Sequence, residues 1–175
     1  MIINRVWAMP NKWTFKIPPI AELIARYVGD GKGWIDPFAG MYSPAEFTND
    51  LNPEMPTQYH LDAREYLEGL RDKYEGVLFD PPYTPRQVKE CYNSVGRHME
   101  QDDALLGYKR GQYKALIAPL IKINGVAISC GWNSVGVGKK HGFEIVELLL
   151  VCHGSDHNDT ICTVERKIQK SMELA

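Results

Sequence analysis

The sequence predicts one α/β domain whose sheet is mainly parallel, on three observations. Short apolar runs that suit buried strands alternate with segments of helical periodicity along most of the chain. Two of these runs stop at an Asp-Pro pair, Asp36-Pro37 and Asp80-Pro81, because proline cannot continue the ladder of a strand. The last two apolar runs follow each other closely and predict a terminal antiparallel strand pair.

Length and composition agree with a single domain that spans residues 1–175. Hydrophobic residues make up 44% of the sequence and charged residues 24%, which is ordinary for a soluble globular protein. No apolar run reaches membrane-spanning length, and residues 1–10 lack the layout of a signal peptide. Since the 4 cysteines do not make a disulfide-dense pattern, a cytoplasmic location is expected.

The first predicted helix begins at a pair of prolines. Residues 1–17 read as irregular and rich in aromatic side chains. Pro18 and Pro19 then suit the first turn of a helix, where proline is tolerated. Apolar residues at helical spacing continue to Val28, and the glycines of residues 29–33 end the helix.

Three short strands and a second helix are predicted next. The helix carries apolar side chains at helical spacing from Ala63 to Tyr74 and leads into a central strand at residues 77–79. The three short strands cover residues 34–38, 47–51 and 58–61.

The connections between these strands are too short for the usual crossover helices. A parallel crossover normally takes about a dozen residues or more, and only residues 41–46 and 52–57 are available. We therefore expect bare loops in place of helices around the second strand. The uncovered face of the sheet should then be buried by the amino-terminal segment or by a second subunit.

The second half of the chain is predicted to hold one helix and three strands. Residues 84–98 are polar and basic and read as partly helical at most. Asp102 or Asp103 is placed to cap a helix whose apolar residues continue to Ile121. The strands cover residues 125–130, 143–152 and 160–167, and a polar loop joins the last two.

The rest of the chain is organised around residues 77–83, Val-Leu-Phe-Asp-Pro-Pro-Tyr. The two prolines stop the strand, which fixes Asp80 and Tyr83 at its carboxyl end, where open α/β sheets bind ligands. A carboxylate beside a prolyl carbonyl can accept both N–H bonds of a nucleobase amine, and an aromatic ring can stack on a base turned out of its helix. An ordinary Asp-Pro turn is the alternative reading of these residues taken alone.

Asp80-Pro81-Pro82-Tyr83 matches the catalytic tetrapeptide of the S-adenosylmethionine-dependent amino-methyltransferases of DNA. The chain resembles that family, in particular the N6-adenine enzymes of phages and restriction–modification systems, from about Trp13 to its end. The resemblance implies a Rossmann-like class I methyltransferase sheet with S-adenosylmethionine as the cofactor. It also implies methyl transfer to the N6 amino group of adenine in DNA.

Further segments resemble the cofactor motifs of this family and occur at the ends of successive predicted strands. The resemblance implies that Asp50 binds the ribose hydroxyls, that Asp62 contacts the cofactor adenine, and that Asp36 lies near the sulfonium. Residues 11–17 resemble the motif that contacts the methionine end. The cofactor-binding residues implied in this way are Asn11, Lys12, Trp13, Phe15, Asp36, Pro37, Phe38, Ala39, Gly40, Asp50, Leu51, Asp62 and Ala63.

By the same resemblance, the flipped adenine stacks on Tyr83 while Asp80 and the Pro81 carbonyl hold its amine, and Pro82 completes the turn. No segment is large enough for a separate target-recognition domain, so specificity would come from residues 84–110, from a homodimer or from a partner protein. Basic side chains concentrate after Tyr83, although a solvated surface explains each of them equally well. The residues predicted to contact phosphates are Arg86, Lys89, Arg97, Lys109 and Arg110.

Two other functions remain open at this point. Small ribosomal RNA methyltransferases also carry an Asp-Pro-Pro-aromatic strand end without a target domain, so an RNA base amine is an alternative substrate. A catalytically idle relative that binds nucleic acid or a partner is the second alternative. No metal site is expected, because the spacing of Cys152, His153, His157 and Cys162 fits no strong zinc pattern.

Overall fold

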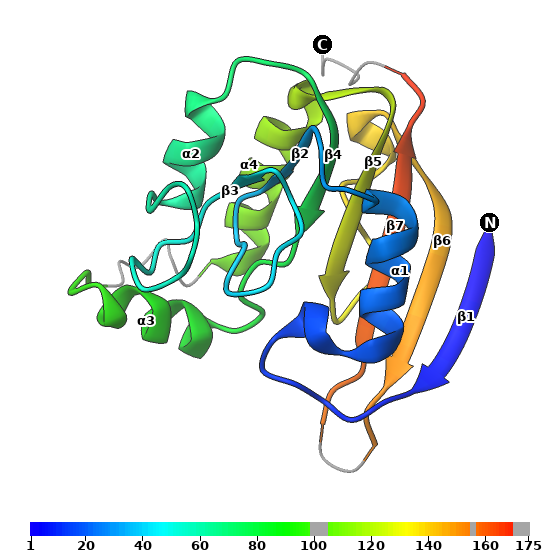
Figure 1. Cartoon of the computed structure of the whole chain (residues 1–175), viewed down its shortest axis with the longest axis horizontal. Coiled ribbons are helices and arrows are strands. Elements are labelled where there is room, and N and C mark those ends of the chain that lie inside the picture. Colours follow the sequence, from blue (N-terminus) through cyan, green and yellow to red (C-terminus); the bar gives the residue numbers. More distant parts are fainter. Residues whose placement is uncertain (99–104, 155–156, 170–175) are drawn as a thin grey trace.

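A mixed sheet of seven strands runs through the computed structural model, which describes residues 1–98, 105–154 and 157–169. The strand order is β1-β6-β7-β5-β4-β2-β3 (Figure 1). Neighbouring strands are parallel except at β7, which is antiparallel to both β5 and β6, so the predicted sheet is confirmed. The strands are β1 (Ile2–Trp7), β2 (Trp34–Asp36), β3 (Phe47–Thr48), β4 (Tyr74–Phe79), β5 (Ile121–Gly131), β6 (Phe143–Cys152) and β7 (Thr160–Lys167).

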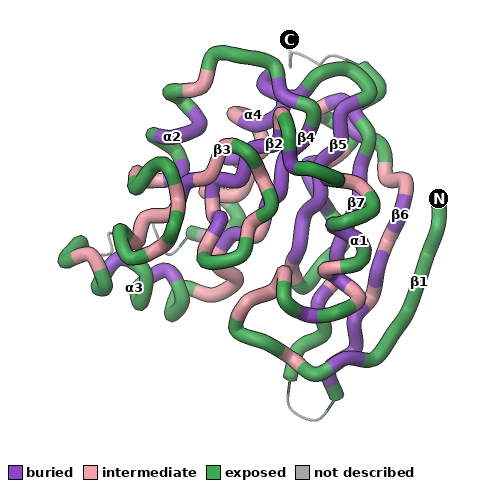
Figure 2. The backbone as a smooth tube through the Cα atoms, viewed as in Figure 1, coloured by how far each residue is buried: buried purple, intermediate pink, exposed green. Residues whose placement is uncertain are grey.

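Helices cover the two faces of this sheet unequally. Helix α1 packs on one face through Ile20, Leu23 and Ile24, and α2 and α4 pack on the other, where their buried side chains meet Val77 and Phe79 of β4. The burial pattern follows this layering, with the central strands buried and the connecting loops exposed (Figure 2). The helices are α1 (Pro18–Val28), α2 (Ala63–Gly69), α3 (Pro85–Ser94) and α4 (Leu106–Leu120), with short 3₁₀ turns at η1 (Thr14–Lys16) and η3 (Lys139–His141).

The amino-terminal part of the chain packs on the sheet beside the short connections, where it reaches Trp34 of β2. Strands β2 and β3 are parallel neighbours, and the residues between them form only turns and loops, as the sequence predicted. Helix α1 covers the sheet instead, and its apolar side chains share one core cluster with Trp34 of β2, Leu78 of β4 and Ile128 of β5. Proline at the start of α1 was also predicted correctly, since the helix begins at Pro18.

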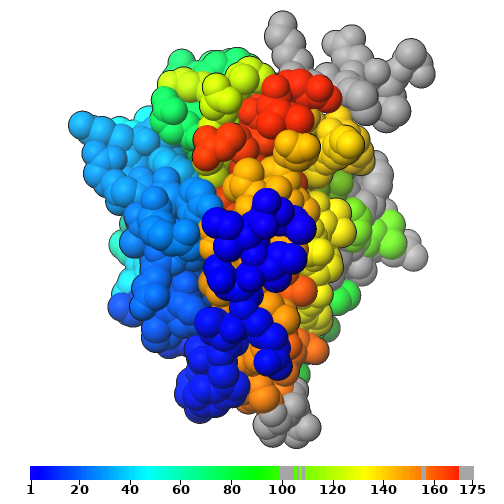
Figure 3. Space-filling view, turned by 90° about the vertical axis from the view of Figure 1, so that its right-hand side faces the viewer, coloured from blue at the N-terminus to red at the C-terminus, as the bar shows by residue number. Residues whose placement is uncertain are grey.

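Strand β1 was not predicted, because residues 1–17 read as irregular. It forms the edge of the sheet and pairs in parallel with β6, Ile2 lying opposite Glu147. All six of its residues are exposed, and the strand, dark blue, lies in the middle of the face turned to the viewer in the space-filling view (Figure 3). Its partner lies far away in the sequence, which is why local periodicity gave no strand signal here.

Two further segments differ from the prediction for local reasons. Residues 58–61 form only a single bridge, between Asn49 and Tyr59, because the Asn49 side chain takes over the pairing by bonding to both the N–H and the carbonyl of Leu61. Residues 84–98 contain a regular helix, α3, since Thr84 and Gln87 form a capping box ahead of it.

Element boundaries account for the remaining differences. Helix α2 ends at Gly69, so Tyr74 opens strand β4 rather than closing a helix, and Ile121 likewise opens β5. The strand expected at residues 47–51 ends at Thr48. The proposed caps at Asp102 and Asp103 lie outside the described residues. In the part of the chain that is described, the helices are too short or too polar to span a bilayer.

Candidate active site

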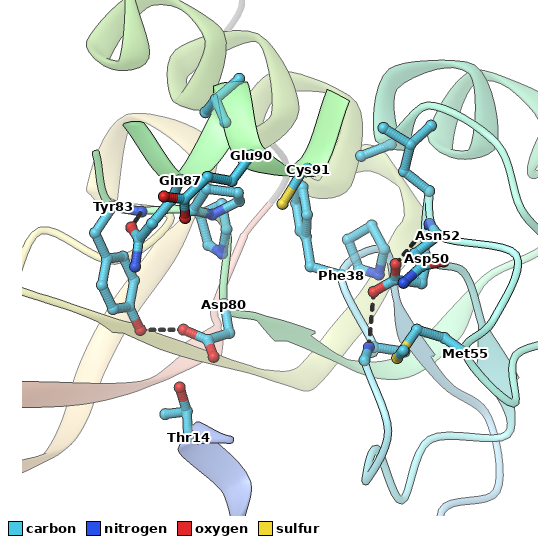
Figure 4. A pocket seen from close by; sticks show the side chains of 18 of the residues that line it. Thr14, Phe38, Asp50, Asn52, Met55, Asp80, Tyr83, Gln87, Glu90 and Cys91 are labelled. Atoms are coloured by element: carbon cyan, nitrogen blue, oxygen red, sulfur yellow. Dashed lines mark hydrogen bonds between the residues drawn. The ribbon is translucent and has the colours of Figure 1, made fainter. Parts of the chain in front are cut away.

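A cavity of about 470 Å³ opens at the carboxyl ends of β2 and β4. This is the edge at which open α/β sheets bind ligands, and the volume suits a molecule of nucleoside size. Its walls come from seven parts of the chain: the η1 turn with Lys12 and Trp13 before it, the β2–β3 loop, the segment around Asp50, the start of α2, the turn after β4, helix α3 and helix α4. Figure 4 shows several of these side chains around the cavity. Segments that are distant in the sequence therefore meet in one site.

The predicted catalytic residues Asp80, Pro81, Pro82 and Tyr83 all line this cavity. The Tyr83 hydroxyl donates a short hydrogen bond to the Asp80 carboxylate (Figure 4). Burial raises the pKa of Asp80, while hydrogen bonds from Tyr83 and Thr14 and the charge of Arg110 act against that rise. The carboxylate is thus enclosed but surrounded by donors.

Helix α3 holds the last residue of this turn in place. The Gln87 side-chain oxygen accepts the backbone N–H of Tyr83 at 2.7 Å and that of Thr84 at 3.0 Å. On the other side, the Tyr83 ring packs against Trp132 with their centroids 5.6 Å apart and their planes at 52°. Sequence reasoning missed both Gln87 and Trp132, because neither belongs to the tetrapeptide.

Asp50 closes the loop that follows β2. Its carboxylate accepts the N–H of Gly40 at 3.0 Å and that of Asn52 at 2.8 Å, and it faces the cavity. Gly40 has a φ of +55°, and an added Cβ would come within 3.2 Å of the Trp13 ring, so this position needs glycine for both conformation and space. The loop is therefore pinned against η1.

Asp36 lies behind this loop instead of facing the cavity. It is fully buried, and its carboxylate accepts the Phe38 N–H at 3.0 Å and the Ser43 hydroxyl at 2.6 Å. Burial is the largest cause that raises its pKa to about 7, and the charges of Asp80 and Asp50 add to the effect. Asp36 is thus not among the residues that line the cavity, and its predicted place near the sulfonium of a cofactor stays a prediction.

Asp62 joins helix α2 to helix α3. Its carboxylate caps α2 by accepting the Arg64 N–H at 3.0 Å, and it accepts hydrogen bonds from the Tyr92 hydroxyl and Arg97, each at 3.2 Å. Arg97 was predicted to contact phosphates, but here it is paired with a carboxylate at the cavity wall. This network fixes α3 above the cavity.

The remaining predicted site residues divide into two groups. All the predicted cofactor-binding residues except Asn11 and Asp36 line the cavity. Of the predicted phosphate contacts, only Lys109 and Arg110 do so, while the exposed Arg86 is paired with Glu90 at 2.8 Å. Cavity residues that sequence reasoning missed are Thr14, Tyr42, Asn52, Met55, Gln87, Val88, Glu90, Cys91, Tyr92, Ser94 and Tyr113.

The histidine of the terminal hairpin has a structural place. One ring nitrogen of His153 is hydrogen-bonded to the Ala8 carbonyl at 2.8 Å and the other to the Thr160 hydroxyl at 2.9 Å. Among the described residues, no three His, Cys, Asp or Glu side chains are grouped as a metal site would require. His153 ties the end of β1 to β7.

Comparison with known proteins gives structural likeness only. No protein-family model matches the sequence, and no curated protein matches it. TrmN from Thermus thermophilus superposes with a TM-score of 0.59 at 15% identity, over 87% of this chain and 49% of that one, so this chain spans about half its length. The fold is that of a Rossmann-like methyltransferase.

Two further structures with this methyltransferase fold are closer in length. A 1,6-didemethyltoxoflavin-N1-methyltransferase from Burkholderia thailandensis, crystallised with S-adenosylhomocysteine, gives a TM-score of 0.55 at 14% identity, over 86% of this chain and 77% of that one. An rRNA methylase from Streptococcus thermophilus gives 0.50 at 11% identity, over 85% of this chain and 93% of that one. The predicted fold class is thereby confirmed.

Proposed function

We propose that this protein transfers a methyl group from S-adenosylmethionine to the N6 amino group of adenine in DNA. The observation that carries the proposal is that the whole tetrapeptide Asp80-Pro81-Pro82-Tyr83 lines the same cavity as the predicted cofactor loops. A donor and an acceptor of a methyl group must meet in one space, and this arrangement provides it. The methyltransferase fold and the sequence resemblance support the same conclusion.

The cavity fits the cofactor in size and in chemistry. Asp50 presents a carboxylate that can accept the ribose hydroxyls, and Asp62 lies farther along the same wall near the expected adenine. Trp13 and Phe38 supply apolar surface beside Gly40, where the backbone can approach a ligand closely. The Burkholderia neighbour, which holds S-adenosylhomocysteine, supports this assignment. The cofactor supplies an electrophilic methyl group on a sulfonium.

The residues after β4 would hold the acceptor amine. The Asp80 carboxylate and the Pro81 carbonyl accept its two N–H bonds, which turns the nitrogen lone pair away from the ring and towards the methyl group. The nitrogen would take the methyl group that S-adenosylmethionine supplies, the thioether would be the leaving group, and Asp80 would receive the proton that the methylated amine gives up. Catalysis comes from positioning in a site that excludes water, without a covalent enzyme intermediate.

The Tyr83 hydroxyl shares the Asp80 carboxylate with the amine in this proposal. In the structure its hydroxyl donates to Asp80, the same carboxylate that the amine would use. An incoming base can displace this bond and stack on the Tyr83 ring, and Trp132, which is 44% exposed, offers a second aromatic surface beside it. Tyr83 thus already contacts the carboxylate that would hold the amine.

The test is methyl transfer from labelled S-adenosylmethionine to unmethylated genomic DNA and to total RNA in parallel, followed by nucleoside mass spectrometry. N6-methyladenine in DNA is the expected product. Asp80→Ala should abolish transfer and leave cofactor affinity nearly unchanged in calorimetry, because Asp80 holds the amine rather than the cofactor. Turnover that survives in Asp80→Ala would contradict the assignment.

An amine of an RNA base is the second candidate substrate. The rRNA methylase from Streptococcus thermophilus is similar in length to this chain, which favours that alternative. A methylated base found in RNA alone would establish it. If neither pool is methylated, titration with S-adenosylmethionine distinguishes the two remaining explanations. Binding of the cofactor would indicate an enzyme that needs a specificity partner or a homodimer. No binding would indicate an idle relative that has lost its affinity for the cofactor.

A further inference from the structure

A second, smaller cavity of about 50 Å³ lies directly beside the catalytic turn. Phe79 and Pro81 line it where β4 ends, Ser129 contributes from β5, and Arg110 and Lys114 contribute from α4. Pro81 and Arg110 also line the main cavity, so the two cavities share a wall. A volume of this size holds a few water molecules or one tetrahedral anion.

Two polar groups of the residues that line this cavity lack partners within the described part of the chain. Ser129 is only 8% exposed, and its hydroxyl oxygen makes no hydrogen bond there. The Nε of Arg110 is buried and unpaired as well, although another nitrogen of the same guanidinium donates to the Pro82 carbonyl at 3.0 Å. A buried polar group without a partner costs about 1–3 kcal/mol, so a ligand that satisfies both groups would be stabilised.

The charge of the cavity selects an anion. Arg110 and Lys114 are four residues apart on α4 and therefore lie on the same side of the helix. Burial and the charge of Arg110 both lower the pKa of Lys114, whereas Glu165 raises it. The Glu165 carboxylate already accepts the N–H groups of Val137 and Gly138. Arg110 and Lys114 thus lie on one small cavity, while the nearby Glu165 carboxylate is already hydrogen-bonded to backbone N–H groups.

We propose that this cavity binds a backbone phosphate of the nucleic acid, next to the nucleotide whose base enters the main cavity. Arginine, lysine and a hydroxyl are the groups that usually hold phosphate oxygens, and such contacts fix the position of a nucleic acid without reading its sequence. The shared wall places this phosphate beside the catalytic turn. The inference rests on the proposed function, and it supplies a contact that would position the nucleic acid beside the catalytic turn.

Binding of a labelled oligonucleotide across a salt series tests the proposal without any need for methyl transfer. Lys114→Gln and Ser129→Ala should each bind about tenfold more weakly. For Lys114→Gln, the slope of log affinity against log salt should also fall in magnitude by about 1. Lys32→Gln, a change at an exposed residue outside both cavities, is the matched control and should leave the affinity and the slope unchanged.

Two further readouts separate the possible results. S-adenosylmethionine affinity and the unfolding midpoint should stay unchanged in both variants, so that a lost contact is distinguished from a lost fold. If the wild type methylates nucleic acid but both variants bind oligonucleotide like Lys32→Gln, the phosphate site is refuted while the proposed function stands. If the wild type shows no methylation but the variants lose affinity for the oligonucleotide, the phosphate site stands and the proposed methyl transfer fails. The proposal would also be overturned if inorganic phosphate binds to the wild type in calorimetry while both variants keep the oligonucleotide affinity of the wild type. The ligand of the cavity would then be a free anion.

Discussion

Replacing Asp36 with asparagine should make the protein more stable at pH 8. Asp36 is fully buried, and its carboxylate is bonded only to the Phe38 N–H and the Ser43 hydroxyl within the described residues. An asparagine of the same shape can keep both bonds, because its oxygen accepts the N–H and its amide donates to the hydroxyl oxygen. The substitution therefore removes a buried charge and leaves the hydrogen bonds in place.

The pKa of Asp36 sets the size of the effect and its direction with pH. Burial raises that pKa from 3.8 in the unfolded chain to about 7 in the folded protein. Between these values the folded state binds the proton more tightly, so the stabilising contribution is fully present below pH 3.8 and is lost as the pH rises to about 7. A difference of 1 in pKa corresponds to about 1.4 kcal/mol, so a difference of about 3 lowers the free energy of unfolding by about 4 kcal/mol once the pH exceeds 7.

Urea unfolding of Asp36→Asn and the wild type at pH 5, 6, 7 and 8 measures this contribution. The variant should gain about 2–4 kcal/mol at pH 8, and its advantage should shrink steadily towards pH 5. Asp30→Asn, at an exposed position, is the control and should show no such trend. An Asp36→Asn protein that is no more stable than the wild type at pH 8 would refute the reasoning.

Three further predictions follow from the site and the sheet. Asp36→Asn should weaken binding of cationic S-adenosylmethionine more than that of neutral S-adenosylhomocysteine in calorimetry, because it removes a negative charge beneath the cavity. Tyr83→Phe should keep methyl transfer, since it frees Asp80 and retains the aromatic ring. Tyr83→Ala should raise the KM for nucleic acid about tenfold or more, because the ring is lost. Equal losses of methyl transfer in both variants would show that the hydroxyl, and not the ring, is needed. Glu147→Ala should lower the free energy of unfolding by about 1 kcal/mol in urea, because the half-exposed Arg26 and the Tyr27 hydroxyl lose a carboxylate partner; an unchanged free energy of unfolding would contradict that role.

Features encoded by adjacent residues could be predicted from the sequence. The prolines at the start of α1 fix its first turn, and β6 and β7 were predicted with their observed bounds, β6 because it is a long and mostly apolar run. The Asp-Pro-Pro-Tyr turn carries its own strand stop. The capping box at Thr84 and Gln87 is equally local, and it could have revealed α3 had it been given more weight than the polar composition of that segment.

Features made by distant residues could not be predicted in this way. Asp36 follows a strand in the same manner as Asp80, yet one is fully buried behind a loop and the other faces the cavity, a difference that depends on how residues 37–46 fold back. Trp132 reaches Tyr83 only because β4 and β5 are neighbours in the sheet. The small cavity likewise needs α4 packed beside the end of β5. Such placements follow from tertiary structure.

The pairing of β1 with β6 has a consequence for how the chain folds during synthesis. The first strand leaves the ribosome early, but Glu147, which lies opposite Ile2 and also binds Arg26 of α1, is made only after most of the chain. Contacts this distant in sequence form slowly, since a long loop must close before they contribute. The backbone N–H and C=O groups of β1 that pair with β6 would meanwhile stay unpaired and open to association with other chains. Completion of β6 is therefore the step expected to protect the nascent protein from aggregation.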